Sequence, residues 1–174
     1  MTDIQYTTVS TSLGALLVAA TSRGVCLVCF GDGVPDLEGR LQAEFPFAVP
    51  TRDDVSLRLW SDELVRTVEG HAERISIPLD VGGSRFQRRV WDALRRIPRG
   101  ETRTYSAVAK SLGQPKAARA VARACAANPV LVVVPCHRVV PVGGSTGGYA
   151  GGAERKRVLL DLETQNLAPS RNAV

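Results

Sequence analysis

The hydrophobic and polar positions of the first thirty residues predict a small antiparallel sheet. Residues 4–9, 15–20 and 25–30 form short runs rich in β-branched and other apolar side chains. Brief turns that contain Gly14 and Gly24 separate these runs. Because turns of this length join neighbouring strands, the pattern favours a three-stranded meander.

Helical spacing of apolar residues follows the predicted sheet. Residues 36–45 and 55–68 are expected to form two helices that pack on it, with acidic and basic side chains on their outer faces. Two glycines within residues 81–83 mark the expected boundary between domains. The pattern therefore predicts an amino-terminal domain over residues 1–83 and a carboxy-terminal domain over residues 84–174.

The carboxy-terminal domain is expected to begin and end with amphipathic helices. The first covers residues 85–96, with Ser84 as its cap. The last covers residues 154–163. The apolar residues predicted to face inward are Phe86, Val90, Trp91 and Leu94 on the first helix, and Val158, Leu159 and Leu162 on the last.

Two short helices between them predict a helix-turn-helix, a motif that places a helix against DNA. One covers residues 105–112, and the other begins at Pro115 and runs to about residue 127. Apart from three basic residues on one stripe, Lys116, Arg119 and Arg123, the second helix is almost wholly alanine. Small side chains around basic ones let a backbone approach a nucleic-acid groove, and high helix propensity is the alternative reason for the alanines.

The charge distribution is one-sided. Residues 1–83 contain 6 Lys and Arg against 12 Asp and Glu, whereas residues 84–160 contain 15 against 3. Each phosphate that a basic residue neutralises releases counterions, so this asymmetry indicates a surface that binds a polyanion. A basic face that only promotes solubility is the alternative.

The composition is that of an ordinary globular protein, with 44% hydrophobic residues. No apolar run approaches the roughly eighteen residues of a membrane helix, and no leader pattern follows Met1, so we expect a cytoplasmic protein without a membrane partner. Its four cysteines should stay thiols there. Cys26 and Cys29 would point to opposite faces of a strand, so neither a metal site nor any other cofactor is expected.

Cys136 and His137 are adjacent within the apolar run of residues 132–140, in which residues 132–134 and 139–140 are predicted to be buried extended chain. A buried cysteine is often only a small hydrophobic residue, so a structural role is the alternative. Adjacent side chains on extended chain point to opposite sides, which favours coupling of thiol and imidazole through a water. A thiolate in an apolar pocket suits attack at an alkyl carbon, and the resulting thioether has no leaving group. Such a protein would act once.

A glycine-rich loop follows this run. Residues 143–152 contain six glycines and Tyr149, so their backbone should be accessible to a ligand. The loop lacks the Gly-Lys-Ser/Thr ending of a phosphate-binding loop, so nucleotide hydrolysis is not indicated.

The motif Pro135-Cys136-His137-Arg138-Val139 resembles the sequence around the acceptor cysteine of the O6-alkylguanine-DNA alkyltransferases, and the resemblance extends over nearly the whole chain. It implies that Cys136 is the acceptor and that Glu163, with His137 and a water, removes its proton. This relay should hold the pKa of the Cys136 thiol below the usual ~8.5 of a free thiol. Tyr105 would help to rotate the nucleotide and protonate guanine, and Asn128 would lie in the turn between the recognition helix and the active site.

The resemblance also implies contacts with DNA and with the alkyl group. Arg119 corresponds to the finger that enters the base stack behind the flipped guanine. The other implied DNA-binding residues are Lys116, Arg123, Ala120 and Tyr105. The implied walls of the substrate pocket are Val139, Tyr149, Ala150, Gly151, Cys125 and Pro135. Ala150 replaces a serine that bonds O6 in some members, and Cys125 occupies a position often held by other residues, which leaves the range of alkyl groups open.

The fold implied by the resemblance is α/β (α+β), with a ribonuclease-H-like amino-terminal domain and a helical, winged-helix-like carboxy-terminal domain. The implied function is direct reversal of damage, in which the alkyl group of O6-alkylguanine, and of O4-alkylthymine, moves irreversibly to Cys136. The expected partner is double-stranded DNA that contains O6-alkylguanine, and the protein is expected to be a monomer that clusters on DNA. A non-catalytic lesion-binding protein or a regulatory helix-turn-helix protein is the alternative, and Cys136 argues against both.

Overall fold

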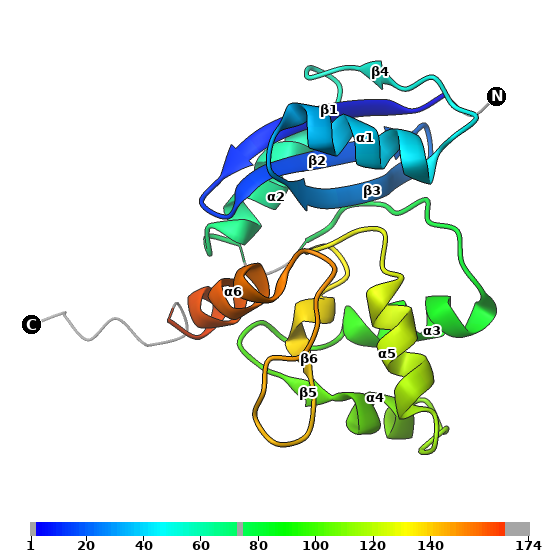
Figure 1. The fold of residues 1–174 in the computed structure, drawn as a ribbon, viewed down its shortest axis with the longest axis vertical. Coiled ribbons are helices and arrows are strands. Elements are labelled where there is room, and N and C mark those ends of the chain that lie inside the picture. Colours follow the sequence, from blue (N-terminus) through cyan, green and yellow to red (C-terminus); the bar gives the residue numbers. More distant parts are fainter. Residues whose placement is uncertain (1–2, 73–74, 166–174) are drawn as a thin grey trace, which may run out of the picture. The chain divides into compact units, whose positions relative to one another are not determined.

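Two compact units make up the chain in the computed structural model, which describes residues 3–72 and 75–165 (Figure 1). The first unit comprises the chain up to Gly83 together with Pro129–Val133. The second comprises Ser84–Asn128 and the chain from Val134 onward.

The first unit is built on a sheet with the strand order β3-β2-β1-β4. The strands are β1 (Gln5–Thr11), β2 (Gly14–Thr21), β3 (Gly24–Gly31) and β4 (Thr51–Arg52). The pairs β1·β2 and β2·β3 are antiparallel, which confirms the predicted meander, and the short β4 adds in parallel to β1.

Burial of the middle strand explains its apolar sequence. On β2, the residues from Leu16 to Ala19 are fully buried, so this interior strand shows no alternation of polar and apolar side chains. Leu17 and Ala19 share a core with Leu37 and Leu41 of the first helix. One face of the sheet is thus covered by an amphipathic helix.

Two helices accompany the sheet, as predicted: α1 (Val34–Glu44) and α2 (Arg58–Val68). The second begins three residues later than expected. The carboxylate of Asp53 accepts hydrogen bonds from the amides of Val55 and Ser56, which holds this stretch in a turn before the helix.

The segment Pro129–Val133 belongs to the first unit because it pairs with β3. The Val28 amide donates to the Pro129 carbonyl at 2.9 Å, and the Leu131 amide donates back to the Val28 carbonyl at 3.0 Å. The chain therefore enters the first unit again just before the Cys136 segment. The assignment of all of residues 84–174 to one domain stays a prediction.

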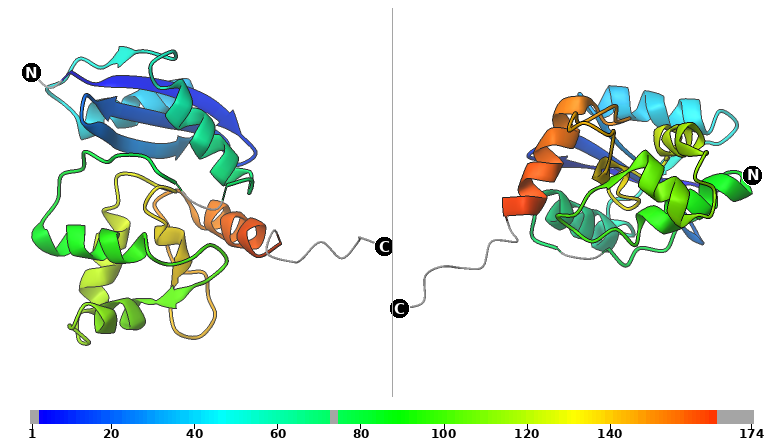
Figure 2. Two further views of the ribbon diagram at one scale, coloured as in Figure 1. Left: turned by 180° about the vertical axis from the view of Figure 1, so that it is seen from behind. Right: turned by 90° about the horizontal axis from the view of Figure 1, so that it is seen from below.

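Helices dominate the second unit. Its elements are α3 (Arg85–Leu94), β5 (Arg103–Thr104), α4 (Tyr105–Ser111), α5 (Ala118–Ala126), a short 3₁₀-helix (Cys136–Arg138), β6 (Val139–Val140) and α6 (Ala153–Gln165). The helices α3, α4 and α5 pack against one another (Figure 2), and β5 pairs in parallel with β6.

Local hydrogen bonds explain where these helices begin. Ser84 caps α3 as predicted, since its hydroxyl accepts from the Gln87 amide at 3.2 Å while the Gln87 side chain accepts from the Ser84 amide. The predicted start of α5 at Pro115 is wrong. The Ala117 amide bonds to the Gln114 carbonyl in a separate turn, and the helix begins at Ala118.

The prediction of extended chain is confirmed for Val139–Val140 but wrong for residues 132–133 and for the Cys136 segment. Val132 has a φ of 73°, a conformation uncommon for a β-branched residue, and it lies in a turn. Cys136–Arg138 forms a 3₁₀-helix, and only Val139–Val140 is a strand. Because the backbone turns at the cysteine, the argument that Cys136 and His137 point to opposite sides does not apply.

The described residues give a mixed α/β fold with a mainly antiparallel sheet and six α-helices. In the same residues no helix is both long and apolar enough to span a bilayer. The ribonuclease-H-like and winged-helix-like descriptions of the two parts stay predictions.

Candidate active site

The thiol of Cys136 is buried on the 3₁₀-helix, with 4% of the residue exposed. The side-chain amide of Asn128 donates to its sulfur at 3.2 Å and to the Val134 carbonyl at 2.9 Å. Asn128 lies just beyond the end of α5. One amide therefore fixes the thiol segment to the end of the helix that carries Arg119.

Burial raises the pKa of the Cys136 thiol, because a thiolate loses its hydration there. The hydrogen bond from Asn128 and the ammonium of Lys156 oppose this rise. The expected fall in the pKa of Cys136 is therefore wrong for the resting protein. A thiol of this kind stays protonated at neutral pH and needs a base to become a nucleophile.

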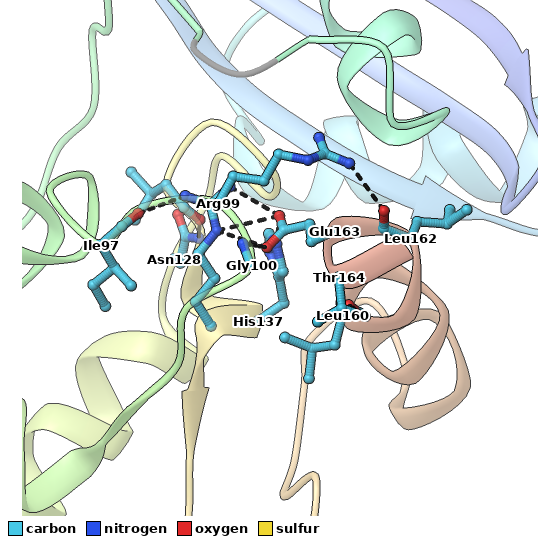
Figure 3. Close-up of polar contacts among 11 residues, drawn as sticks. Ile97, Arg99, Gly100, Asn128, His137, Leu160, Leu162, Glu163 and Thr164 are labelled. Atoms are coloured by element: carbon cyan, nitrogen blue, oxygen red, sulfur yellow. Dashed lines mark hydrogen bonds and ion pairs between the residues drawn. The ribbon is translucent and has the colours of Figure 1, made fainter. Parts of the chain in front are cut away.

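A buried carboxylate lies next to the histidine. Nε2 of His137 is 2.8 Å from Oε1 of Glu163, and the guanidinium of Arg138 donates to both carboxylate oxygens at 2.8–3.2 Å. Arg138 also donates to the Ile97 carbonyl at 2.7 Å. Figure 3 shows His137 and Glu163 together, with Glu163 projecting from the last helix, α6.

The charges of this pair follow from its partners. Burial alone would raise the pKa of Glu163, but the hydrogen bonds from His137 and Arg138 hold it at about 2. Burial lowers the pKa of His137 despite the neighbouring carboxylate. At neutral pH the pair is thus an anionic Glu163 and an uncharged His137. Because a carboxylate only accepts hydrogen bonds, the imidazole proton lies on Nε2, and Nδ1 is left as a lone-pair acceptor.

Two buried polar atoms near the thiol have no hydrogen-bond partner among the described residues: Nδ1 of His137 and the hydroxyl of Tyr149. The two rings contact each other edge to face, with centroids 6.2 Å apart. Burial raises the pKa of Tyr149 well above its ordinary value, and an ionised Cys136 and the carboxylate of Glu163 would raise it further. Unsatisfied buried groups are costly and often mark functional sites, so these two atoms point to a place where a ligand or water binds.

Lys156 is fully buried, and nothing in the sequence pattern had singled it out. Its ammonium donates to the Val139 carbonyl at 2.7 Å and to the Gly148 carbonyl at 3.2 Å, so it connects β6 to the glycine-rich loop. Burial lowers the pKa of Lys156.

Of the residues predicted to face inward on α6, only Leu159 is buried, and Lys156 and Glu163 are the polar residues buried beside it. Lys156 and Glu163 are three and four residues from Leu159, so all three lie on one helix face. This spacing is the sequence feature that could have predicted the burial of Lys156.

Tyr105 is the first residue of α4 and is half-buried. Burial raises its pKa, and an ionised thiol at Cys125 or Cys136 would raise it further. The loop approaches this tyrosine at Gly147, which has a φ of 70°. A Cβ at Gly147 would lie 2.8 Å from Cδ of Pro141 and 3.6 Å from the Tyr105 hydroxyl, so both the conformation and the space require glycine there.

The helix α5 presents some of the predicted DNA-binding residues to solvent. Arg119 and Arg123 are exposed, and Ala120 is half-exposed. Lys116 is also exposed, but it precedes the helix, so the predicted three-residue stripe holds on α5 only for the two arginines. The indole of Trp91 donates to the Ala124 carbonyl at 2.9 Å and anchors the other side of the helix to α3.

The remaining predicted pocket residues differ in exposure. Pro135, Val139 and Gly151 are buried, whereas Ala150 is exposed. Cys125 is buried on α5, and burial raises the pKa of its thiol to about 12. Cys125 therefore stays protonated and does not compete as a nucleophile. Within the described ranges no cluster of His, Cys, Asp and Glu could hold a metal ion.

A buried cysteine, a neighbouring uncharged histidine and a carboxylate that orients the histidine are the arrangement found in proteins that use an activated thiol as a nucleophile. Comparison with known proteins identifies which of these it resembles. Residues 85–165 match the family model described as the DNA-binding domain of 6-O-methylguanine DNA methyltransferase.

Named relatives agree with this match. The chain is 40% identical to the inducible methylated-DNA–protein-cysteine methyltransferase of Bacillus subtilis, over 84% of this chain and 82% of that protein. It is 37% identical to a protein of the same name from Methanosarcina acetivorans, over 91% and 97% of the respective chains. The bifunctional transcriptional activator/DNA repair enzyme Ada of Escherichia coli is 40% identical over 94% of this chain, which spans only 46% of Ada.

The fold matches as well. The crystal structure of Mycobacterium tuberculosis OGT in complex with DNA superposes with a TM-score of 0.81 and 34% identity, over 93% of this chain and 94% of that one. The chain thus belongs to the O6-methylguanine-DNA methyltransferase family, whose curated members carry the name methylated-DNA–protein-cysteine methyltransferase.

Proposed function

We propose that this chain repairs DNA by direct reversal. The sulfur of Cys136 attacks the alkyl carbon of O6-alkylguanine, and of O4-alkylthymine, in a DNA duplex. A carbon–sulfur bond forms, the bond from carbon to the base oxygen breaks, and the base is restored. The product is an uncharged thioether, which has no leaving group that water could displace, so each molecule acts once.

The observation that carries this proposal is the pairing of a buried, protonated thiol with a histidine that has an unpartnered Nδ1. Asn128 holds the sulfur at 3.2 Å, and Glu163 holds the other ring nitrogen of His137 at 2.8 Å. His137 takes the thiol proton at Nδ1, through a water that also bonds the sulfur. The nearby Glu163 carboxylate stabilises the imidazolium that forms.

Tyr105 is the proposed acid for the departing base. Its raised pKa keeps its hydroxyl protonated at neutral pH, so a proton is available when negative charge develops on the guanine. Val139, Pro135, Cys125, Tyr149, Ala150 and Gly151 are the proposed walls of the pocket for the alkylated base.

DNA is the proposed partner, held by a helix-turn-helix made of α4 and α5. The lesion lies inside a duplex, so its alkyl carbon reaches a buried thiol only when the nucleotide is turned out, at a cost of a few kcal/mol. Arg119, exposed on α5, fills the vacated space, and Lys116, Ala120 and Arg123 contact the backbone. The related OGT of Mycobacterium tuberculosis has been crystallised in complex with DNA, which supports this partner.

The remaining expectations are proposals of the same kind. The family resemblance supports a ribonuclease-H-like first part over residues 1–83 and a winged-helix-like second part over residues 84–174. It also supports a monomer that works in the cytoplasm and clusters on DNA.

Intact-mass analysis tests the proposed activity. The protein is incubated with a duplex oligonucleotide that contains one O6-methylguanine, and the Cys136→Ala variant is the control. The proposal expects a mass gain of one methyl group on the wild-type protein, located at Cys136 by peptide mapping, and none on the variant. No mass gain on the wild-type protein would overturn it.

A further inference from the structure

A groove of about 570 Å³ lies between α3 and α4 in the second unit. Ile97 and Val108, both buried, line it together with Ala93, Ala107 and Leu112, which are partly or fully exposed and supply its apolar surface. Arg89, Arg96 and Arg103 line it with Asp92. Apart from Ile97, whose carbonyl accepts from Arg138, none of the residues named above for the active site belongs to this lining.

The cationic side chains of the groove differ in how they are held. Arg89 donates to the Leu112 carbonyl at 2.8 Å, which fixes its guanidinium over the end of α4. Arg103 is paired with Glu101 at 2.7 Å. The side chain of Arg96 is exposed and makes neither a hydrogen bond nor an ion pair with residues that the structure describes. The groove thus contains one guanidinium bonded to a backbone carbonyl, one paired with an acid, and one, that of Arg96, without a hydrogen bond or ion pair to the described residues.

The groove opens on a different side of α3 from the one that faces α5. Arg89 and Asp92 are three residues apart on α3, so they share one stripe of the helix, and Arg96 follows two residues after the helix ends. Trp91, which bonds to α5, is two residues from Arg89, or about 200° around the helix. The groove is therefore a separate surface from the exposed arginines of α5.

The chemistry of this lining favours a phosphate ligand. A guanidinium fork matches the oxygens of a phosphate, and the three guanidiniums outweigh the carboxylates of Asp92 and of Glu101, the partner of Arg103. The apolar surface that solvent reaches on Ala93, Ala107 and Leu112 suits the sugar that follows each phosphate in a nucleic-acid strand. A ligand that lacks a sugar would leave this apolar surface uncovered.

We propose that the groove between α3 and α4 binds the phosphate backbone of a second DNA segment. This inference rests on the proposed function, because the first segment is the duplex held by α5. Since the lining of the groove contains no residue of α5, one molecule contacts two segments at the same time. Phosphates of the second segment bind Arg96 and Arg89, and its sugars cover Ala93, Ala107 and Leu112.

A bridging assay tests this inference. The full chain is saturated with an immobilised duplex that contains O6-methylguanine, and the capture of a fluorescent undamaged duplex from solution is measured at fixed salt. Arg96→Glu should reduce capture about tenfold, because it removes a phosphate contact and adds a repulsive charge. Arg95→Glu is the matched control, since Arg95 is exposed, adjacent in sequence and absent from the groove. It should retain capture within about twofold of wild type.

Three results would overturn the inference: no capture by wild type, equal loss in both variants, or displacement of the second duplex by polyglutamate as readily as by unlabelled DNA. Displacement by polyglutamate would mean that the groove accepts acidic peptides in general. Transfer of the methyl group to the protein is measured in the same samples. Capture without transfer would count against the proposed function alone, and transfer without capture would count against the groove alone.

Discussion

Nε2 of His137 and Oε1 of Glu163 are 2.8 Å apart, and this contact determines the tautomer of the imidazole. The carboxylate can only accept a hydrogen bond, so it takes the Nε2 proton and leaves Nδ1 as an acceptor. Arg138 fixes the carboxylate in turn, through bonds to both of its oxygens. The acceptor beside the thiol thus depends on a buried chain of three side chains.

Replacing Glu163 with glutamine should slow alkyl transfer by at least about tenfold, because the amide no longer enforces the tautomer or stabilises an imidazolium. Affinity for the lesion oligonucleotide should change little. Glu154→Gln is the matched control, since Glu154 is an exposed acid of the same helix that pairs with Arg157 at 2.6 Å. Single-turnover rates and equilibrium binding are measured on the same oligonucleotide. A Glu163→Gln protein that unfolds more easily but reacts at the normal rate would show that Glu163 is only structural.

Stability should fall in acid because of the same pair. The folded-state pKa of Glu163 is about 2, below its ordinary 4.5. Ionised Glu163 therefore adds on the order of 3 kcal/mol to the free energy of unfolding. This contribution is fully present above about pH 4.5 and is lost as the pH falls toward about 2. His137 adds to this trend, because its lowered pKa means that the unfolded chain takes up a proton more readily, from about pH 6.5 downward. Urea unfolding at a series of pH values measures the slope. A Glu163→Gln variant as pH-dependent as wild type would contradict this assignment.

Replacing Lys156 with methionine should raise the pKa of the Cys136 thiol, since the ammonium is one of the groups that lower it. The substitution also leaves the Val139 and Gly148 carbonyls without their donor, so alkyl transfer should slow. The rate of iodoacetamide labelling of Cys136 as a function of pH gives the thiol pKa directly. Lys110→Met, at an exposed lysine of α4, controls for loss of charge. An unchanged thiol pKa would limit Lys156 to holding the loop.

Replacing Arg119 with alanine should slow repair of a duplex more than reaction with free O6-benzylguanine, because only the duplex requires a nucleotide to be held out of the stack. Arg123→Ala removes the other exposed arginine of α5 and should weaken binding without this selective effect. The two rates are measured for each variant. Equal losses on both substrates would show that Arg119 supports the fold.

Local pattern was enough to predict the meander and the cap of α3, because hydrogen bonds between residues close in sequence specify both. The same pattern misplaced the start of α5, where Pro115 belongs to a turn and not to the first turn of the helix. It also failed around Cys136. A valine run favours extended chain, but the 73° φ of Val132 and the 3₁₀-helix after it depend on contacts with the rest of the fold.

The sequence predicted only part of the site. Cys136 and His137 are adjacent in sequence, and the family resemblance supplied Glu163 and Asn128. The roles of Arg138 and Lys156 were not foreseen, because charged residues are usually exposed and only tertiary structure shows that these two are buried. The direction of the Cys136 pKa was missed although burial of its segment was predicted, because the relay with His137 was expected to outweigh the loss of hydration.

Counting alkyl groups per protein molecule tests the central claim most directly. The protein is mixed with a large excess of duplex that contains O6-methylguanine, repaired bases are counted over time, and the modified residue is located by peptide mass. The proposed mechanism predicts that repair stops at one equivalent, with the methyl group on Cys136 and none on Cys125, Cys26 or Cys29. Repair that continues well past one equivalent, or a methyl group on another cysteine, would contradict it.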